Sequence, residues 1–87
     1  MKITLSDHAI DRLLQRNLPD PREAELLPIS GAIKKKMKRT MTQVYYRKTM
    51  KQGPVFYLNR DDFYAVYIFR KLSDSCIMLI TAYWLEE

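Results

Sequence analysis

The chain has 87 residues, a net charge of +5 and an apolar fraction of 47%. This length predicts a single domain over residues 1–87 with a thin core, because a domain of this size buries only about 60 to 65% of the surface that its unfolded chain exposes. No run approaches the roughly 18 apolar residues of a transmembrane helix, and the N-terminus lacks the apolar run of a signal peptide. We therefore expect a folded cytoplasmic protein that does not enter a membrane.

The first predicted elements are a short strand and a helix. Residues 2–5 alternate between polar and apolar side chains, which predicts a strand. A helix is expected over about residues 7–17, with Ser6 or Asp7 as its N-cap and Asn17 in the left-handed conformation that commonly closes a helix.

The expected helix presents basic side chains along one flank. At roughly 100° per residue, positions 8, 12 and 16 drift only about 80° around the axis. His8, Arg12 and Arg16 therefore stack on one flank, and this set of an imidazole and two guanidinium groups suits a phosphate. The apolar side of the helix is expected to consist of Ile10, Leu13, Leu14 and Leu18.

A second helix is predicted to begin at residues 20–23, where Asp20 is a suitable N-cap and Pro21 occupies the first helical position. Pro28 and Gly31 interrupt its pattern. The helix therefore either kinks there or restarts at Ser30, and it is expected to reach about Lys38.

From Gln43 onward the apolar period changes to two and β-forming residues dominate, which predicts strands at 44–46, 55–58, 63–69 and 76–84. The connections between them are short, and short connections favour antiparallel neighbours. The expected fold class is α+β, with two N-terminal helices packed on a four-stranded antiparallel sheet and the short N-terminal strand in addition.

Basic residues are concentrated in the middle of the chain. Residues 34–51 hold eight of the fifteen Lys and Arg and no Asp or Glu. This pattern predicts RNA or another polyanion as a partner, and the alternative is a solvated face that keeps the protein soluble. The residues expected to bind nucleic acid are Lys34, Lys35, Lys36, Lys38, Arg39, Arg47 and Lys48.

Several kinds of chemistry are disfavoured by the residues present. Cys76 is the only cysteine and His8 the only histidine, so a closed zinc site of four protein ligands cannot form from them. The acidic residues are scattered, which disfavours two-metal catalysis, and the two glycines cannot build a glycine-rich phosphate loop. We therefore expect neither a metal nor another cofactor.

Acid and base chemistry on RNA remains, because RNA supplies its own nucleophile, the 2′-OH. On the last expected strand Thr81 and Tyr83 share a face, opposite Ile80, Ala82 and Trp84. If that face meets the basic helix flank, an active site results. The candidate catalytic residues are His8 as base or acid, Arg12 and Arg16 as an electrostatic clamp, and Thr81 and Tyr83.

Each of these residues also has a purely structural interpretation. A lone histidine is often bonded to a helix cap or to a nearby carboxylate such as Asp11. Arginines at this spacing often form surface ion pairs worth about 0 to 1 kcal/mol. Tyrosines in small sheets are mostly packing residues, although an exposed one can stack on a base.

A family resemblance rests on two motifs, His8-Ala9-x-x-Arg12-x-x-x-Arg16 after a short strand and Ile80-Thr81-Ala82-Tyr83 in the closing strand. They resemble small domains of bacteria and phages related to RelE-type toxins, within the barnase, colicin and RelE-like ribonuclease superfamily. The resemblance implies helices on an antiparallel sheet, metal-independent RNA cleavage and, for chromosomal toxins, a neutralising antitoxin. The chain departs from the commonest form of the motif, which has Gly where Asn17 stands.

Two functions from different classes follow. The first is a toxin-like endoribonuclease that cleaves RNA by acid and base catalysis without a metal. The alternative is a basic binding protein of the same fold without catalytic activity, such as a phage-encoded inhibitor of a host nucleic-acid-binding enzyme. An antitoxin would be the protein partner in the first case and a host protein in the second.

Overall fold

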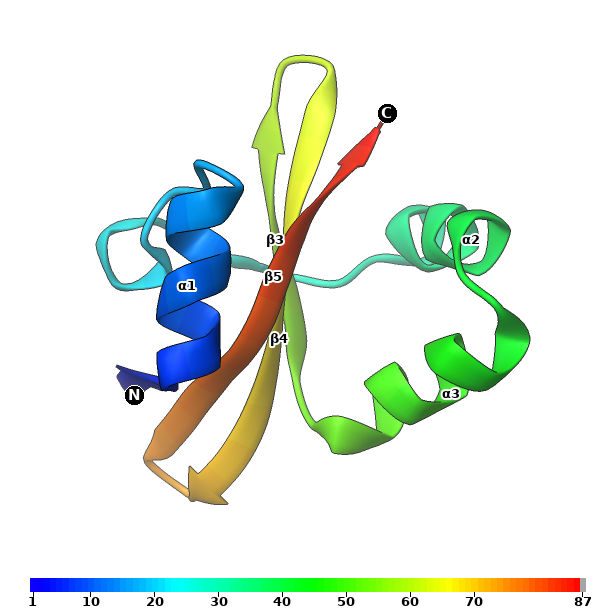
Figure 1. The fold of residues 1–87 in the computed structure, drawn as a ribbon. Helices are drawn as coiled ribbons and strands as arrows, with labels where there is room; N and C mark the ends of the chain where they lie inside the picture. Colours follow the sequence, from blue (N-terminus) through cyan, green and yellow to red (C-terminus); the bar gives the residue numbers. More distant parts are fainter. Residues whose placement is uncertain (87) are drawn as a thin grey trace.

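The computed structural model describes residues 1–86. They form a five-stranded sheet in the order β1-β5-β4-β3-β2, three α-helices and one 3₁₀ turn (Figure 1). The elements are β1 (Lys2–Leu5), α1 (Asp7–Gln15), η1 (Pro21–Glu23), β2 (Leu27–Pro28), α2 (Gly31–Thr40), α3 (Gln43–Gln52), β3 (Val55–Arg60), β4 (Phe63–Ser73) and β5 (Cys76–Glu86). The predicted α+β class is confirmed, whereas the predictions of two helices and of a purely antiparallel four-stranded sheet are wrong.

The sheet is mixed because its first strand runs parallel to its last. Strands β3, β4 and β5 form the expected antiparallel meander. Strand β1 lies beside β5 in the same direction, with Lys2 opposite Cys76 and Leu5 opposite Leu79. This pairing joins the two ends of the chain, so no short turn in the sequence could indicate it. At the other edge β2 pairs antiparallel with β3.

Residues 20–23 do not begin a helix. The Asp20 carboxylate accepts a hydrogen bond from the Arg22 backbone N–H at 2.9 Å, but the turn it caps is the short η1. Leu27 and Pro28 are then extended as β2. Proline disfavours the helical conformation of the residue before it and cannot donate to a ladder, so this short edge strand accommodates it.

The helix restarts after Ser30, whose hydroxyl accepts a hydrogen bond from the Ile33 N–H at 3.3 Å. The next element corrects a prediction, because residues 44–46 lie in helix α3 and not in a strand. Thr42 caps α3 by accepting from the Tyr45 N–H at 3.2 Å. The apolar side of α3 then packs on the sheet, and this burial outweighs the β-propensity of its Val and Tyr residues.

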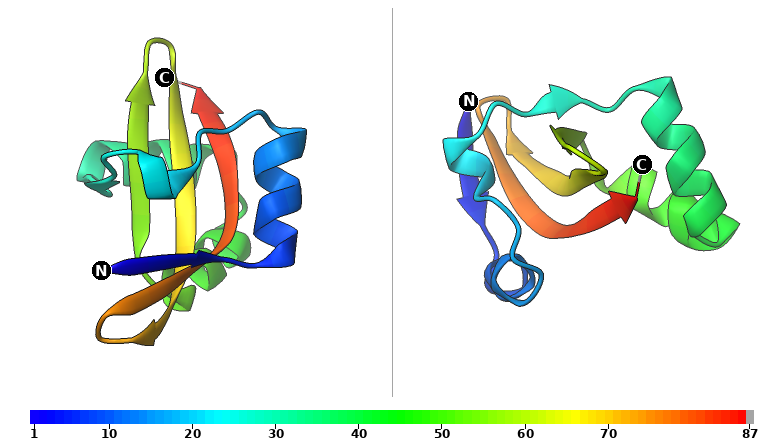
Figure 2. Two further views of the ribbon diagram at one scale, coloured as in Figure 1. Left: turned by 90° about the vertical axis from the view of Figure 1, so that its left-hand side faces the viewer. Right: turned by 90° about the horizontal axis from the view of Figure 1, so that it is seen from above.

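Both faces of the sheet are covered. Helix α1 lies on one side, and α2 and α3 lie on the other (Figures 1 and 2). The central strand β4 is therefore buried continuously from Ala65 to Phe69. The core on the α1 side includes Ala9, Leu13, Leu58, Tyr67, Phe69 and Leu79, and the core on the α2–α3 side includes Ile33, Met37, Val55, Val66, Ile68 and Leu85.

The apolar side of α1 differs from the expected one. Ala9, Leu13 and Leu18 are buried, whereas Ile10 is 40% and Leu14 is 76% exposed. The helix packs mainly against the single strand β5, so only a narrow stripe of its surface is covered.

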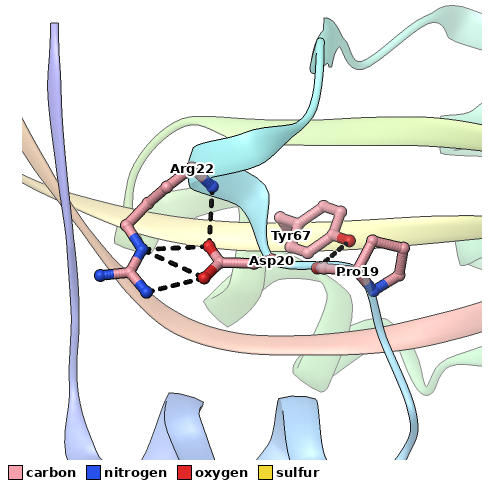
Figure 3. A network of polar contacts seen from close by, with 4 residues as sticks. All are labelled: Pro19, Asp20, Arg22 and Tyr67. Carbon is pink, nitrogen blue, oxygen red and sulfur yellow. Dashed lines mark hydrogen bonds and ion pairs between the residues drawn. The ribbon is translucent and has the colours of Figure 1, made fainter.

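The loop after α1 is anchored by a small polar network (Figure 3). The Tyr67 hydroxyl donates to the Pro19 carbonyl at 2.7 Å, and Asp20 forms an ion pair with Arg22 at 2.7 Å. Asn17 has the left-handed conformation predicted for it, with φ of 51°.

Along residues 1–86, no helix combines the length and the apolar character needed to cross a membrane.

Candidate functional site

A cleft lies between α1 and α3, with β5 as part of its floor. All five residues predicted to be catalytic line it, since α1 contributes His8, Arg12 and Arg16 and β5 contributes Thr81 and Tyr83. Its opposite wall comes from α3, through Tyr45, Lys48, Thr49 and Gln52. We refer to this group of residues as the α1–α3 cleft.

Helix α1 attaches to the part of the β5 edge that β1 leaves unpaired. Strand β1 pairs with β5 only as far as Leu79, so the outer edge of the second half of β5 remains available. The last turn of α1 attaches there. The Arg16 Nη1 group donates to the Ala82 carbonyl at 2.7 Å, and the Trp84 Nε1 group donates to the Arg16 carbonyl at 2.7 Å. These two bonds place the basic flank of α1 beside β5.

A bulge in β5 shapes the floor of the cleft. Ile68 of β4 lies opposite Thr81 and Phe69 lies opposite Leu79, so Ile80 has no partner. As a result Ile80 and Thr81 both line the cleft, and the prediction that Ile80 faces away from Thr81 is wrong. Beyond the bulge the alternation resumes, with Tyr83 in the cleft and its neighbours Ala82 and Trp84 packed in the core on the α1 side.

His8 is exposed and is bonded to the next residue of the flank. Arg12 Nε donates to His8 Nε2 at 3.3 Å, and Arg12 Nη1 donates to Gln15 Oε1 at 3.1 Å. The partner of His8 is thus Arg12 and not Asp11. The Nε2 atom of His8 is the acceptor of this bond, so Arg12 covers that side of the imidazole.

No carboxylate among residues 1–86 forms an ion pair with the guanidinium groups of the cleft. The ion pairs found among residues 1–86 involve Arg22 and Lys71, which do not line the cleft. Arg12 and Arg16 therefore create a positive potential there, to which Lys48 adds from α3. Such a potential attracts a phosphate group.

Tyr83 supplies a hydroxyl group that stays protonated. Its oxygen lies 3.9 Å from the Met41 sulfur, in a half-buried position. Burial, with a smaller contribution from nearby Tyr45, raises the pKa of Tyr83 well above its usual value. At neutral pH this group can donate a hydrogen bond to a bound anion but cannot act as a base.

The predicted nucleic-acid-binding residues are divided between three places. Lys48 lines the α1–α3 cleft. Lys38 and Arg47 line a separate hollow beside Tyr46, whose ring centroid lies 5.4 Å from Lys38 Nζ. The other four, Lys34, Lys35, Lys36 and Arg39, lie on α2 outside the lining of the cleft.

Tyr45 lines the cleft from a helix, although its segment was expected to be a strand. Thr42 is a possible N-cap three residues before Tyr45, and this local signal could have indicated the helix. The position of α3 opposite β5, on the other side of the cleft, has no local signal in the sequence.

Within the described part of the chain, no three His, Cys, Asp or Glu residues are grouped so that they could hold a metal ion. No family model, curated protein or solved structure matches this chain significantly. The fold and the cleft therefore define its class on their own, as a small basic α+β protein with a cationic cleft beside the last strand of a mixed sheet.

Proposed function

We propose that the protein is a metal-independent endoribonuclease that uses the 2′-OH of RNA as the nucleophile. The observation that supports this function is the α1–α3 cleft, where an imidazole, two guanidinium groups, an ammonium group and a protonated tyrosine hydroxyl line one surface. Among residues 1–86, neither guanidinium group forms an ion pair. These are the groups that cleavage of RNA without a metal requires.

Each group has a role in the proposed reaction. A phosphate that enters the cleft attracts the guanidinium group of Arg12. The hydrogen bond from Arg12 to His8 then breaks, so the Nε2 lone pair of His8 becomes free to accept a proton. His8 then removes the 2′-OH proton, and the 2′-oxygen attacks phosphorus. The bond from phosphorus to the 5′-oxygen breaks, and Lys48 donates a proton to the leaving oxygen. The products are a 2′,3′-cyclic phosphate and a free 5′-OH.

The charge that builds up on the phosphoryl oxygens is stabilised by Arg12 and Arg16. One N–H group of Arg16 is already used on the Ala82 carbonyl, which orients the guanidinium group before substrate arrives. Tyr83 donates its hydroxyl proton in a hydrogen bond to the same oxygens. Preorganised donors of this kind are each worth about 10²- to 10³-fold in rate.

The test is incubation of the purified protein with total RNA in EDTA, followed by analysis of product ends. We expect cleavage with cyclic phosphate ends. His8→Ala should lower the rate by about 10²- to 10⁴-fold, as expected for a lost general base. Arg12→Ala should lower it by on the order of 10²-fold. Both variants should retain the circular dichroism spectrum of the parent, because both side chains lie at the surface.

Matched controls come from the same regions of the chain. Leu14→Ala changes the opposite side of α1, where the side chain is 76% exposed, and Arg22→Ala removes an arginine outside the cleft. Both should cleave at the parent rate. Equal cleavage by the parent and by His8→Ala would refute the proposed site, and no cleavage by the parent would refute the enzyme.

A binding protein without catalytic activity is the second candidate. It is favoured by the five cations of α2, none of which lines the cleft. In that case RNA is bound but not cleaved, and substitutions in α2 weaken binding more than His8→Ala does.

A further inference from the structure

A second hollow adjoins the α1–α3 cleft at the end of β5. It is lined by the aromatic residues Tyr45, Phe63, Tyr83 and Trp84, together with Arg16 and Glu86, and we refer to it as the aromatic hollow. Arg16, Tyr45 and Tyr83 line both the hollow and the cleft. A ligand could therefore occupy the two sites together, with Arg16 between them.

Two aromatic side chains of the hollow are exposed, and the indole of Trp84 is held in place. Tyr45 is 52% and Phe63 is 44% exposed, although phenylalanine is usually buried. The Phe63 and Trp84 rings meet edge to face, with centroids 6.2 Å apart. The hydrogen bond of Trp84 to the Arg16 carbonyl fixes the indole, so little side-chain entropy would be lost on binding.

Aromatic surface next to arginine is the combination that binds single-stranded nucleic acid, since bases stack on the rings and the cations contact the backbone. The net charge of +5 favours a polyanion over an uncharged apolar partner. A double helix does not fit this arrangement, because its bases are already stacked and paired.

We propose that the aromatic hollow binds the unstacked base of the nucleotide next to the phosphate in the cleft, so that the substrate class is single-stranded RNA. The inference rests on the proposed function for the position of that phosphate. Tyr45 lies between the two sites and is the main stacking surface. Arg16 contacts the backbone between the base and the reacting phosphate.

Trp84 can serve as an intrinsic fluorescence probe of binding, because it is the only tryptophan of the chain and lines the hollow. A short 2′-O-methyl RNA strand cannot be cleaved, since its 2′-oxygen has no proton to lose. We expect this strand to change the Trp84 fluorescence in a saturable way. The same strand annealed to its complement should bind at least about fivefold more weakly at equal salt, because a stacked base is unavailable to Tyr45.

Three variants of α3 separate stacking from other effects. Tyr45→Ala should weaken binding of the single strand by roughly fivefold or more, whereas Tyr45→Phe, which keeps the ring, should bind like the parent. Val44→Ala is the matched control, because its side chain is 66% exposed and does not line the hollow. Equal affinity for single strand and duplex, or parent-like binding by Tyr45→Ala, would overturn the inference. So would the absence of any fluorescence change.

The two proposals can fail separately. Selective binding that requires Tyr45, without cleavage of natural RNA, would support the aromatic hollow and refute the enzyme. Cleavage that requires His8, with no preference for single strands, would support the enzyme and refute the aromatic hollow.

Discussion

Burial raises the pKa of two tyrosines of the sheet, Tyr67 and Tyr83. Tyr67 also holds the loop that follows α1. Tyr67 is fully buried, and its hydroxyl donates to the carbonyl of Pro19, in the loop that follows α1. This contact connects the central strand to the end of the helix that carries the basic flank. Burial raises the pKa of Tyr67 to about 12, because the phenolate would lose its hydration.

Stability should therefore fall in alkaline solution through Tyr67. In the unfolded chain this tyrosine ionises near pH 10, but in the folded protein it ionises only near pH 12. The stabilisation is complete below pH 10 and is lost as the pH rises toward 12, and it amounts to roughly 2 to 3 kcal/mol. Urea unfolding followed by circular dichroism over this pH range measures the loss.

The variant Tyr67→Phe separates ionisation from the hydrogen bond. At neutral pH it should cost about 1 kcal/mol, because the Pro19 carbonyl loses its donor. Between pH 10 and 12 its free energy of unfolding should fall less steeply than that of the parent. Parallel pH profiles for the two proteins would show that Tyr67 does not cause the alkaline loss.

At the scale of elements, the junction between α3 and β3 determines where α3 lies against the sheet. Gly53 follows α3 directly, and the next residue, Pro54, accepts a hydrogen bond from the Phe69 N–H at 3.0 Å. The backbones of the two segments are in close contact there. A Cβ atom at Gly53 would overlap the Phe69 carbonyl oxygen.

We therefore expect Gly53→Ala to destabilise the protein by about 1 to 3 kcal/mol, since neither backbone can move freely to relieve the overlap. Gly31→Ala is the matched control, because a Cβ there has no atom within 4 Å. Being in a helix, it should leave stability unchanged or raise it by up to about 1 kcal/mol. Thermal unfolding of both variants measures the difference, and equal melting temperatures would contradict the expectation.

At the scale of the whole molecule, positive charge is concentrated on the side of the sheet covered by α2 and α3. These helices carry all seven residues predicted to bind nucleic acid, and only Lys48 among them lines the cleft. Lys2 and Arg22 line a different hollow, beside β1. The molecule thus offers a comparison between cations on the proposed RNA path and cations away from it.

Binding of single-stranded RNA should weaken with salt in proportion to the number of phosphates contacted, with a slope of about 0.7 per contact in a plot of log affinity against log salt. Replacing Arg12 and Lys48, which line the α1–α3 cleft, by alanine should reduce that slope. Replacing Lys2 and Arg22 should leave it unchanged, because these residues do not line the cleft. An equal reduction by both sets would mean that net charge, and not a defined path, attracts the RNA.

Local signals in the sequence determined most of the elements. The alternation at residues 2–5 predicted β1, and Ser6 caps α1 by accepting from the Ala9 N–H at 3.1 Å. The predicted strands at 55–58, 63–69 and 76–84 lie within β3, β4 and β5. Periodicity and capping involve neighbours in the chain, which is why they can be read without a structure.

The sequence predicts a common site for these residues only if the last strand meets the flank of the first helix. His8 and Arg12 share that flank because of helical periodicity alone. Their meeting with Thr81 depends on the bonds of Arg16 to Ala82 and of Trp84 to Arg16, which join residues 66 and 68 positions apart. No local pattern encodes such contacts.

The α+β class, the basic flank of α1 and the strands of the meander can be predicted from the sequence, because each depends on interactions over a few residues. The parallel pairing of β1 with β5, the helix at residues 43–52 and the bulge that brings Ile80 and Thr81 into the cleft become visible in the folded protein alone. These features depend on which surfaces are buried against each other across the whole chain. Burial of that kind outweighs local propensity.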